Sequence, residues 1–212
     1  MNRIKYLFID FNGTLLDDRQ LCLDLLNEFL EEQHKKTLDM DSYKDIFGFP
    51  IREYYLKAGL TFENESYEDM AIRFIDQYKR LSLNCTLYDD VVDTLRYLKD
   101  RDVKLILLSA SEINNLISQT NYYKITDYFD DILGTSDIYA NSKEEIGIDY
   151  IKKNNIDLDE CLFVGDTTHD FEVANKMGIY SVLVLCGHQS YKRLNELNVK
   201  LINSFNDIKE II

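Results

Sequence analysis

The sequence predicts an α/β protein, with a doubly wound parallel sheet and a helical insert after the first strand. Short apolar runs alternate with longer amphipathic segments over most of the chain, which is typical of a parallel sheet covered by helices. One interval breaks this alternation, because about 90 residues separate the first two runs and a single crossover helix needs far fewer. Several runs also end in polar residues, which predicts that one edge of the sheet carries the polar side chains of a ligand-binding site.

Six apolar runs predict the strands, and the segments between them predict the helices. The runs occupy residues 4–10, 103–109, 130–134, 161–166, 180–186 and, more weakly, 199–202. The helical patterns occupy residues 89–100, 111–122, 143–154, 168–177 and a last stretch near 205–211. With the first strand central, these elements form a core domain of residues 1–16 and 85–212.

The long interval, residues 17–84, is predicted to be a helical insert. It contains three segments with apolar residues at three- and four-residue spacing, as in amphipathic helices. Their sequences are CLDLLNEFLEEQH, IREYYLKAGL and YEDMAIRFIDQYKRLSL. We therefore expect a smaller helical domain beside the core.

Composition and charge narrow the class of protein. The chain has 212 residues and a formal net charge of -14, which repels phosphate backbones and anionic membranes, so we expect neither nucleic acid nor a membrane as partner. The N-terminus lacks a signal-peptide pattern and no apolar stretch approaches the roughly 18 residues of a membrane span, which predicts a cytoplasmic protein. The four cysteines lack C-x-x-C spacing, so free thiols are expected. We expect a monomer or a weak homodimer.

Five polar residues are predicted at one edge of the sheet. Asp10 ends the first strand, Ser109 ends the second, and Asp166 ends the fourth, with Asp170 four residues later. Lys143 opens the helix that precedes the fourth strand. Each alone has a structural explanation, such as a turn, a helix cap or a solvated first-turn residue. Structure alone does not require all five together, and ligands bind beyond the carboxyl ends of parallel strands.

Three grouped carboxylates favour a metal-dependent phosphoryl site. Crowded like charges are costly unless a cation is present, and Mg²⁺ prefers a few carboxylates while leaving positions for a phosphate. A carboxylate can also act as a nucleophile and form an aspartyl-phosphate, which divides one difficult displacement into two easier ones. Ser109 and Lys143 would then bind phosphate oxygens.

Four motifs in this order resemble those of the haloacid dehalogenase superfamily. They are DFNGT after the first strand, LLSAS after the second, Lys143, and GDTTHD after the fourth. The segments TLYDDVVDTLRYLKDRDVKLILLSAS and DIFGFPIREYYLKAGL also resemble phosphoglycolate-phosphatase-like members with a small helical cap. The resemblance covers nearly the whole chain. It implies a Rossmann-like core, a cap over residues 17–84, and a Mg²⁺-dependent phosphatase acting on a small phosphorylated metabolite.

The same resemblance implies the metal site and the nucleophile. Asp10 would be the nucleophile. Mg²⁺ would be held by Asp10, the main-chain carbonyl of Asn12 and Asp166, with Asp170 nearby or acting through water.

It also implies how the phosphate is bound. Thr14 and Ser109 would hydrogen-bond near the nucleophile and the phosphate, and Lys143 would offset the negative charge. Gly13 would let backbone amides approach closely. Arg52 is the cap cation expected to meet the substrate, with an exposed helix charge as the alternative.

Asn12 departs from the family pattern, in which an aspartate protonates the leaving group and then activates water. An amide can do neither. General acid–base assistance is worth about 10²–10⁴-fold, so Asn12 predicts a slower enzyme before an inactive one. An activated phosphate should then give a burst, and Asn12→Asp should raise the steady rate by about 10²-fold or more.

Several alternatives remain open at this point. His169 and His188 are candidate replacements for the missing acid, although a lone histidine is more often structural. A dehalogenase or a phosphomutase of the same fold ranks lower than a phosphatase. From a different class, a non-catalytic relative would only bind a phosphorylated ligand or partner.

Overall fold

The computed structural model describes residues 3–135 and 142–212. A six-stranded sheet has the order β5-β4-β1-β6-β7-β8, and each of its pairings is parallel. The strands are β1 (Tyr6–Ile9), β4 (Lys104–Glu112), β5 (Asp131–Thr135), β6 (Cys161–Gly165), β7 (Tyr180–Val184) and β8 (Lys200–Ile202). All six predicted strands are confirmed, and β1 is central.

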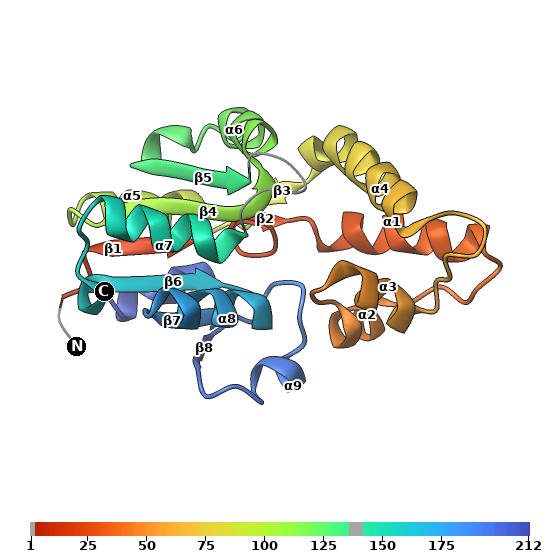
Figure 1. Cartoon of the computed structure of the whole chain (residues 1–212). Helices are drawn as coiled ribbons and strands as arrows, with labels where there is room; N and C mark the ends of the chain where they lie inside the picture. Colours follow the sequence, from red (N-terminus) through yellow and green to blue (C-terminus); the bar gives the residue numbers. More distant parts are fainter. Residues whose placement is uncertain (1–2, 136–141) are drawn as a thin grey trace.

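Helices cover both faces of this sheet, so the fold is doubly wound as predicted (Figure 1). One face packs against α5 (Val91–Lys99), α6 (Ile113–Tyr122) and a 3₁₀ helix (Phe205–Glu210). The other face packs against α7 (Lys143–Lys153) and α8 (Thr168–Met177). Alternation along β1 makes both faces apolar, since Leu7 and Ile9 belong to the first layer and Phe8 to the second.

Two predicted boundaries were wrong. Strand β4 does not end at Ser109 but continues to Glu112, because it pairs with β5 again after a register shift, through Glu112 and Thr135. Helix α6 therefore begins at 113 instead of 111, and Glu112 caps it by accepting from the backbone N–H groups of Asn114 and Asn115. The stretch near 205–211 is a 3₁₀ helix.

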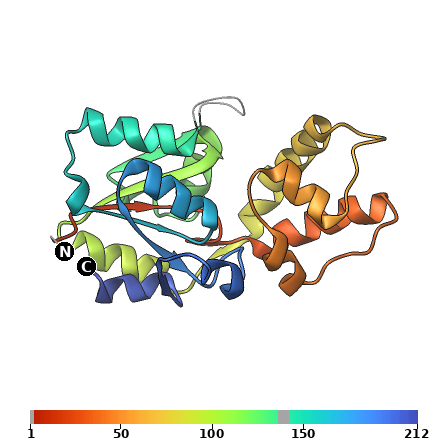
Figure 2. The same ribbon diagram turned by 60° about the horizontal axis from the view of Figure 1, so that its bottom comes forward.

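Four helices form a separate lobe in the interval after β1 (Figure 2). They are α1 (Arg19–Glu32), α2 (Met40–Ile46), α3 (Ile51–Ala58) and α4 (Tyr67–Leu81). The lobe, called the cap below, has its own apolar cluster around Phe29, Tyr43 and Tyr55. Two residues on each side of the cap pair as an antiparallel ribbon, β2 (Leu16–Asp17) with β3 (Thr86–Leu87), which the sequence did not reveal. A one-turn helix, α9 (Tyr191–Leu194), follows β7.

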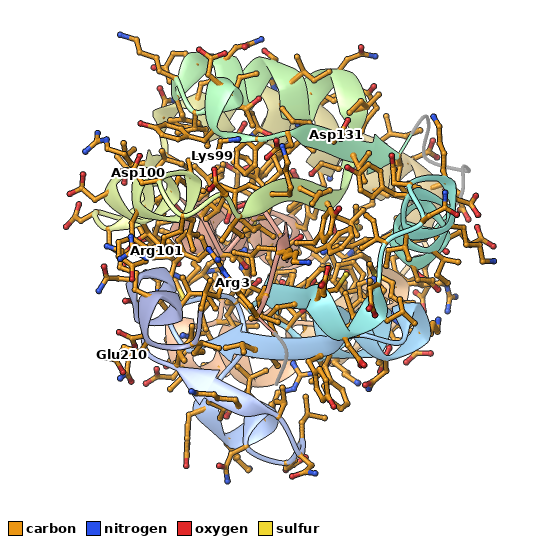
Figure 3. The ribbon with its side chains drawn as sticks, turned by 90° about the vertical axis from the view of Figure 1, so that its left-hand side faces the viewer. Arg3, Lys99, Asp100, Arg101, Asp131 and Glu210 are labelled. Carbon is orange, nitrogen blue, oxygen red and sulfur yellow. The ribbon has the colours of Figure 1, made fainter. Side chains whose placement is uncertain are left out.

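The amino-terminal ends of the strands lie at the end of the core remote from the cap (Figure 1). Figure 3 views this end, where Arg3, Lys99 and Arg101 are interspersed with Asp100, Asp131 and Glu210. Acidic partners engage several of its cations, for example Asp130, which pairs with Lys99 and Lys104. The polar residues predicted to carry chemistry lie at the opposite ends of the strands, facing the cap.

The remaining expectations on composition concern cysteines and membranes. All four cysteines are free thiols: Cys22 and Cys161 are buried, and Cys85 and Cys186 are partly buried. Within residues 3–135 and 142–212, none of the helices combines the length and the apolar character that crossing a bilayer requires.

Candidate active site

Asp10, Lys143 and Asp170 form a buried chain of charges at the carboxyl edge of the sheet. Asp10 directly follows β1, and Lys143 is the first residue of α7, after the N-cap Ser142. The Lys143 Nζ lies 2.5 Å from Asp10 Oδ1 and 2.6 Å from Asp170 Oδ1. Lys143 is only 4% exposed, so it is not a solvated first-turn residue. Burial alone would lower its pKa, but the two carboxylates raise it, which keeps the ammonium charged.

Asp170 is held in place on both sides. Its Oδ2 accepts hydrogen bonds from the backbone N–H groups of Asp166 and Thr167 and from the Thr167 hydroxyl, at 2.6–3.1 Å. Thr167 is thus the N-cap of α8, and Asp166 does not cap the helix. Although burial would raise the pKa of Asp170, Lys143 and Thr167 hold it below its ordinary value.

Asp166 is fully buried between two loops. Its Oδ1 accepts from the Thr14 hydroxyl at 3.1 Å, and its Oδ2 accepts from the His188 backbone N–H at 2.7 Å. Gly13 has a φ of 73°, and a Cβ there would lie 2.4 Å from Asp166 Oδ2. A Cβ at Gly187 would lie 2.2 Å from the same carboxylate. Both loops therefore need glycine to approach Asp166 so closely.

The donor set fits a hard divalent cation. One oxygen of each of Asp10, Asp166 and Asp170 lies within 4.8 Å of the others. When all three are ionised, Lys143 leaves two negative charges, which one Mg²⁺ would offset. Asp170 accepts four hydrogen bonds, one of them from the Lys143 ammonium, whereas Asp166 accepts two, so Asp10 and Asp166 are the better direct ligands.

The pKa values of the two candidate ligands reflect this excess of negative charge. Burial outweighs the attraction of Lys143 and, with the neighbouring carboxylates of Asp170 and Asp166, raises the pKa of Asp10 to about 8. Burial also raises the pKa of Asp166 to about 6, against the attraction of His188. A cation would allow both groups to be ionised at neutral pH.

The remaining predicted residues differ in how they are placed relative to the carboxylates. Ser109 is buried near the end of β4, where its Oγ accepts from the Ser111 backbone N–H at 3.1 Å. The Gly13 backbone N–H is engaged with Leu16 O and Asp18 Oδ1. Arg52 lies exposed on α3, with its guanidinium 5.2 Å from the Phe62 ring centroid, and none of its contacts involves the carboxylates. Its contact with substrate stays a prediction.

A second buried cluster surrounds Asp18, which the sequence analysis missed. Its Oδ1 accepts from the Gly13 backbone N–H and pairs with His188 Nε2, both at 3.0 Å. Its Oδ2 accepts from Asn12 Nδ2 at 2.9 Å and from the Tyr78 hydroxyl at 2.6 Å. Although burial would raise the pKa of Asp18, His188, Tyr78 and Asn12 hold it below its ordinary value. We call Asp18 and these partners the Asp18 cluster.

His188 is the ionisable partner of Asp18. Burial alone would lower its pKa, but Asp18 raises it above the ordinary value. The other ring nitrogen, Nδ1, lies 2.7 Å from the Tyr43 hydroxyl of the cap. Cys22 Sγ lies 3.9 Å from Asp18 Oδ2, so Asp18, Cys22 and His188 are close enough together to hold a metal ion. Hydrogen bonds already satisfy the Asp18 carboxylate, however. His169 packs on the Phe49 ring at a centroid distance of 4.6 Å.

The cap touches the site through these same loops. Phe47 stacks on the His188 ring, with centroids 4.8 Å apart, and Gln189 Nε2 donates to Phe47 O at 2.9 Å. Ser190 N donates to Lys44 O at 3.1 Å. The cap residue Tyr78 contacts both Asp18 and Asn12. The cap therefore contacts the loops at the carboxyl edge of the sheet.

Sequence reasoning missed four polar residues of this region: Asp18, Tyr43, Tyr78 and Ser111. Asp18 had a weak signal, because a second acid follows Asp17 directly after the glycine turn. The two tyrosines lie on cap helices whose packing onto the loops could not be read from periodicity. Ser111 was read as part of a helix, whereas it belongs to β4 and donates to Asn12 Oδ1 at 3.0 Å.

Comparison with known proteins supports the family. The sequence profile of haloacid dehalogenase-like hydrolases matches residues 6–184. A phosphoglycolate phosphatase of Colwellia psychrerythraea is 23% identical over 214 residues, covering 96% of this chain and 95% of that protein. A phosphoglycolate phosphatase of Nitrosospira multiformis is 24% identical over 208 residues, covering 94% and 91%.

Solved structures agree with this fold. A haloacid dehalogenase-like family hydrolase from Streptococcus pneumoniae superposes with a TM-score of 0.82 at 18% identity, covering 100% of this chain and 98% of that one. These similarities agree with the profile match, with the ordered motifs and with the buried chain of charges formed by Asp10, Lys143 and Asp170. Together they assign the protein to a family. The chain belongs to the haloacid dehalogenase-like hydrolases, and it is similar to phosphoglycolate phosphatases along nearly its whole length.

Proposed function

We propose that the protein is a Mg²⁺-dependent phosphatase that hydrolyses a small phosphorylated metabolite through an aspartyl-phosphate on Asp10. The observation that supports this most is the buried Lys143 ammonium between Asp10 and Asp170, with the Asp166 carboxylate beside them. This arrangement presents a nucleophile, a phosphate-binding cation and two metal ligands at one point. Phosphatase activity is also named for relatives that this chain matches along nearly its whole length.

Each residue has a defined part in the proposed reaction. Lys143 holds Asp10 Oδ1, while Asp10 Oδ2 accepts no hydrogen bond within residues 3–135 and 142–212 and is free to attack phosphorus. The bond between phosphorus and the leaving oxygen then breaks. Mg²⁺, when held by Asp10, Asp166 and the main-chain carbonyl of Asn12, would polarise the phosphoryl oxygens and offset their charge. In the second step water attacks phosphorus, the bond between phosphorus and the Asp10 oxygen breaks, and a proton of the water passes to solvent, which releases phosphate and regenerates the Asp10 carboxylate.

The proposal includes slow turnover, because no carboxyl group stands at position 12. The Asn12 amide donates to Asp18 and Tyr78 and accepts from Ser111, so it has no proton to give and no base to offer. An aryl phosphate needs little protonation of its leaving group, so the first step would stay fast. The second step would be slow, and the aspartyl-phosphate would accumulate.

Stopped-flow release of 4-nitrophenol from its phosphate, with and without Mg²⁺, tests this function. We expect a Mg²⁺-dependent burst near one equivalent, slow steady turnover, and phosphorylated Asp10 by mass spectrometry after acid quench. Asp10→Asn should remove the burst, and a panel of phosphorylated metabolites would then identify the substrate class. Absence of both burst and phosphate release with any activated phosphate would favour a non-catalytic binding protein instead.

A further inference from the structure

Asp18 uses its side chain in an unusual way for its position. It is the N-cap of α1, where an aspartate ordinarily accepts from the backbone N–H groups of the first helical turn. Here no such side-chain bond forms, and the carboxylate turns instead toward the loop that follows Asp10. With 1% exposure, it is buried among the donors Gly13, Asn12, Tyr78 and His188. The Asp18 carboxylate therefore serves the loop after Asp10 and does not cap helix α1.

Asn12 fits this carboxylate because it is an amide. Its Nδ2 donates to Asp18 Oδ2 at 2.9 Å and to the Tyr78 hydroxyl oxygen at 2.5 Å, and its Oδ1 accepts from Ser111 Oγ. Both ends of the amide are thus satisfied. An aspartate at position 12 would replace the donor with an acceptor oxygen that faces Asp18. The hydrogen bond from position 12 to Asp18 would then be lost, and two acceptor oxygens would face each other in its place.

We propose that Asp18 is a positioning residue that fixes the Asn12 amide against Tyr78 of the cap, and that position 12 cannot carry a working acid–base carboxylate while position 18 carries a carboxylate. This inference rests on the proposed phosphatase function. It also revises the expectation drawn from the sequence, because Asn12→Asp alone no longer suffices to restore fast turnover. The exchange of both residues, Asn12→Asp with Asp18→Asn, keeps the charge of the pair and returns a donor to face the new carboxylate.

The test compares the wild type with Asn12→Asp, Asp18→Asn and the double variant. The readouts are burst amplitude and steady-state phosphate release from 4-nitrophenyl phosphate with Mg²⁺. We expect the double variant to exceed the steady rate of Asn12→Asp by about 10²-fold, with a smaller burst. Only the double variant should also gain a new ionisation in its pH–rate profile, which a merely structural repair would not produce.

Asp17, the residue before Asp18, offers a matched control. Its carboxylate pairs with Arg19, 2.7 Å away, and does not contact Asn12. Asp17→Asn combined with Asn12→Asp removes the same charge one residue away and should give no rescue. If Asp18→Asn fails to fold, Asp18→Thr replaces it as a neutral partner in the same comparison.

Two results would overturn the inference: a 10²-fold gain from Asn12→Asp alone, or a folded double variant no faster than Asn12→Asp. If none of the proteins releases phosphate or gives a burst, the proposed function fails, and thermal unfolding decides the pairing separately. Asn12→Asp should then lower Tm by about 5 °C or more, and Asp18→Asn, but not Asp17→Asn, should recover most of that loss. Additive changes in Tm would refute the pairing.

Discussion

Two buried carboxylate clusters lie on either side of the glycine turn after β1, and they are balanced in opposite ways. Around Asp10, three carboxylates share one ammonium, so the cluster is short of positive charge. Around Asp18, one carboxylate has His188 and three neutral donors, so each of its oxygens has two hydrogen-bond partners. The difference favours the first cluster as the place for a cation, although both contain residues that can ligate metals.

The contrast between the two clusters would be contradicted most strongly if Asp166 could be replaced without loss of activity or of Mg²⁺ binding. Asp166→Asn takes away a candidate ligand that touches both loops, so turnover should fall by about 10³-fold or more, equivalent to ~4 kcal/mol. Isothermal titration should detect no Mg²⁺ binding, and Mg²⁺ should no longer raise Tm. Asp127→Asn, an exposed carboxylate on the core, is the control. Metal-independent activity that survives Asp166→Asn would refute the metal site.

Lys143→Met tests the shortage of positive charge directly. Without the ammonium, three carboxylates are left buried together, and breaking a buried pair in this way costs about 3–5 kcal/mol. Urea unfolding in EDTA should show this loss, and Mg²⁺ should recover part of it. The control is Lys176→Met, because Lys176 pairs with Glu144 at 2.6 Å on the surface, where solvent screens the pair and its loss should change stability little. Equal losses in the two variants would contradict the assignment.

Tyr78→Phe tests the completeness of the Asp18 cluster. It removes the hydroxyl that donates to Asp18 at 2.6 Å, a hydrogen bond to a charged group worth about 1.5–3 kcal/mol. Tyr54→Phe is the matched control, since Tyr54 is also buried in the cap and its hydroxyl has no hydrogen bond in the described part of the chain. Chemical denaturation should separate the two variants. Mg²⁺ should not restore the stability lost in Tyr78→Phe.

The smallest effect is a pH dependence of the Asp10 cluster. The folded-state pKa values of Asp10, about 8, and Asp166, about 6, lie above the ordinary 3.8, so the metal-free folded protein binds extra protons between these limits. Their contribution to stability is therefore present at low pH and is lost as pH rises to about 8. From pH 6 to 8 in EDTA, we expect the free energy of unfolding to fall as the Asp10 carboxyl group loses its proton in the folded protein. Saturating Mg²⁺, which binds the ionised carboxylates, should abolish this slope; an unchanged slope would contradict it.

The core of the fold could be predicted from the sequence because its pattern is local. The apolar runs that became β1 and β6 are bounded by polar residues, and strand ends fix where Asp10 and Asp166 must lie. Lys143 and Asp170 followed from helix starts in the same way. These four residues meet because parallel strands end at one edge of the sheet, which is a rule of the architecture.

The Asp18 cluster could not be predicted, because it depends on how the cap packs onto the core. Tyr78 is 60 residues from Asp18 in sequence and His188 is 170 residues away, and no periodicity links them. His188 was singled out only as a candidate acid, whereas the structure gives both of its ring nitrogens partners. The extension of β4 beyond Ser109 was equally hidden, since it depends on pairing with β5.

The β2–β3 ribbon has a mechanical consequence. Both chain segments that join the cap to the core run through this ribbon side by side, paired at only two positions, Leu16 with Leu87 and Asp17 with Thr86. Because the two linkers are paired, a displacement of the cap would move both of them together. Asp18 directly follows the paired residue Asp17, so such a displacement would also act on the hydrogen bond between Asn12 and Asp18.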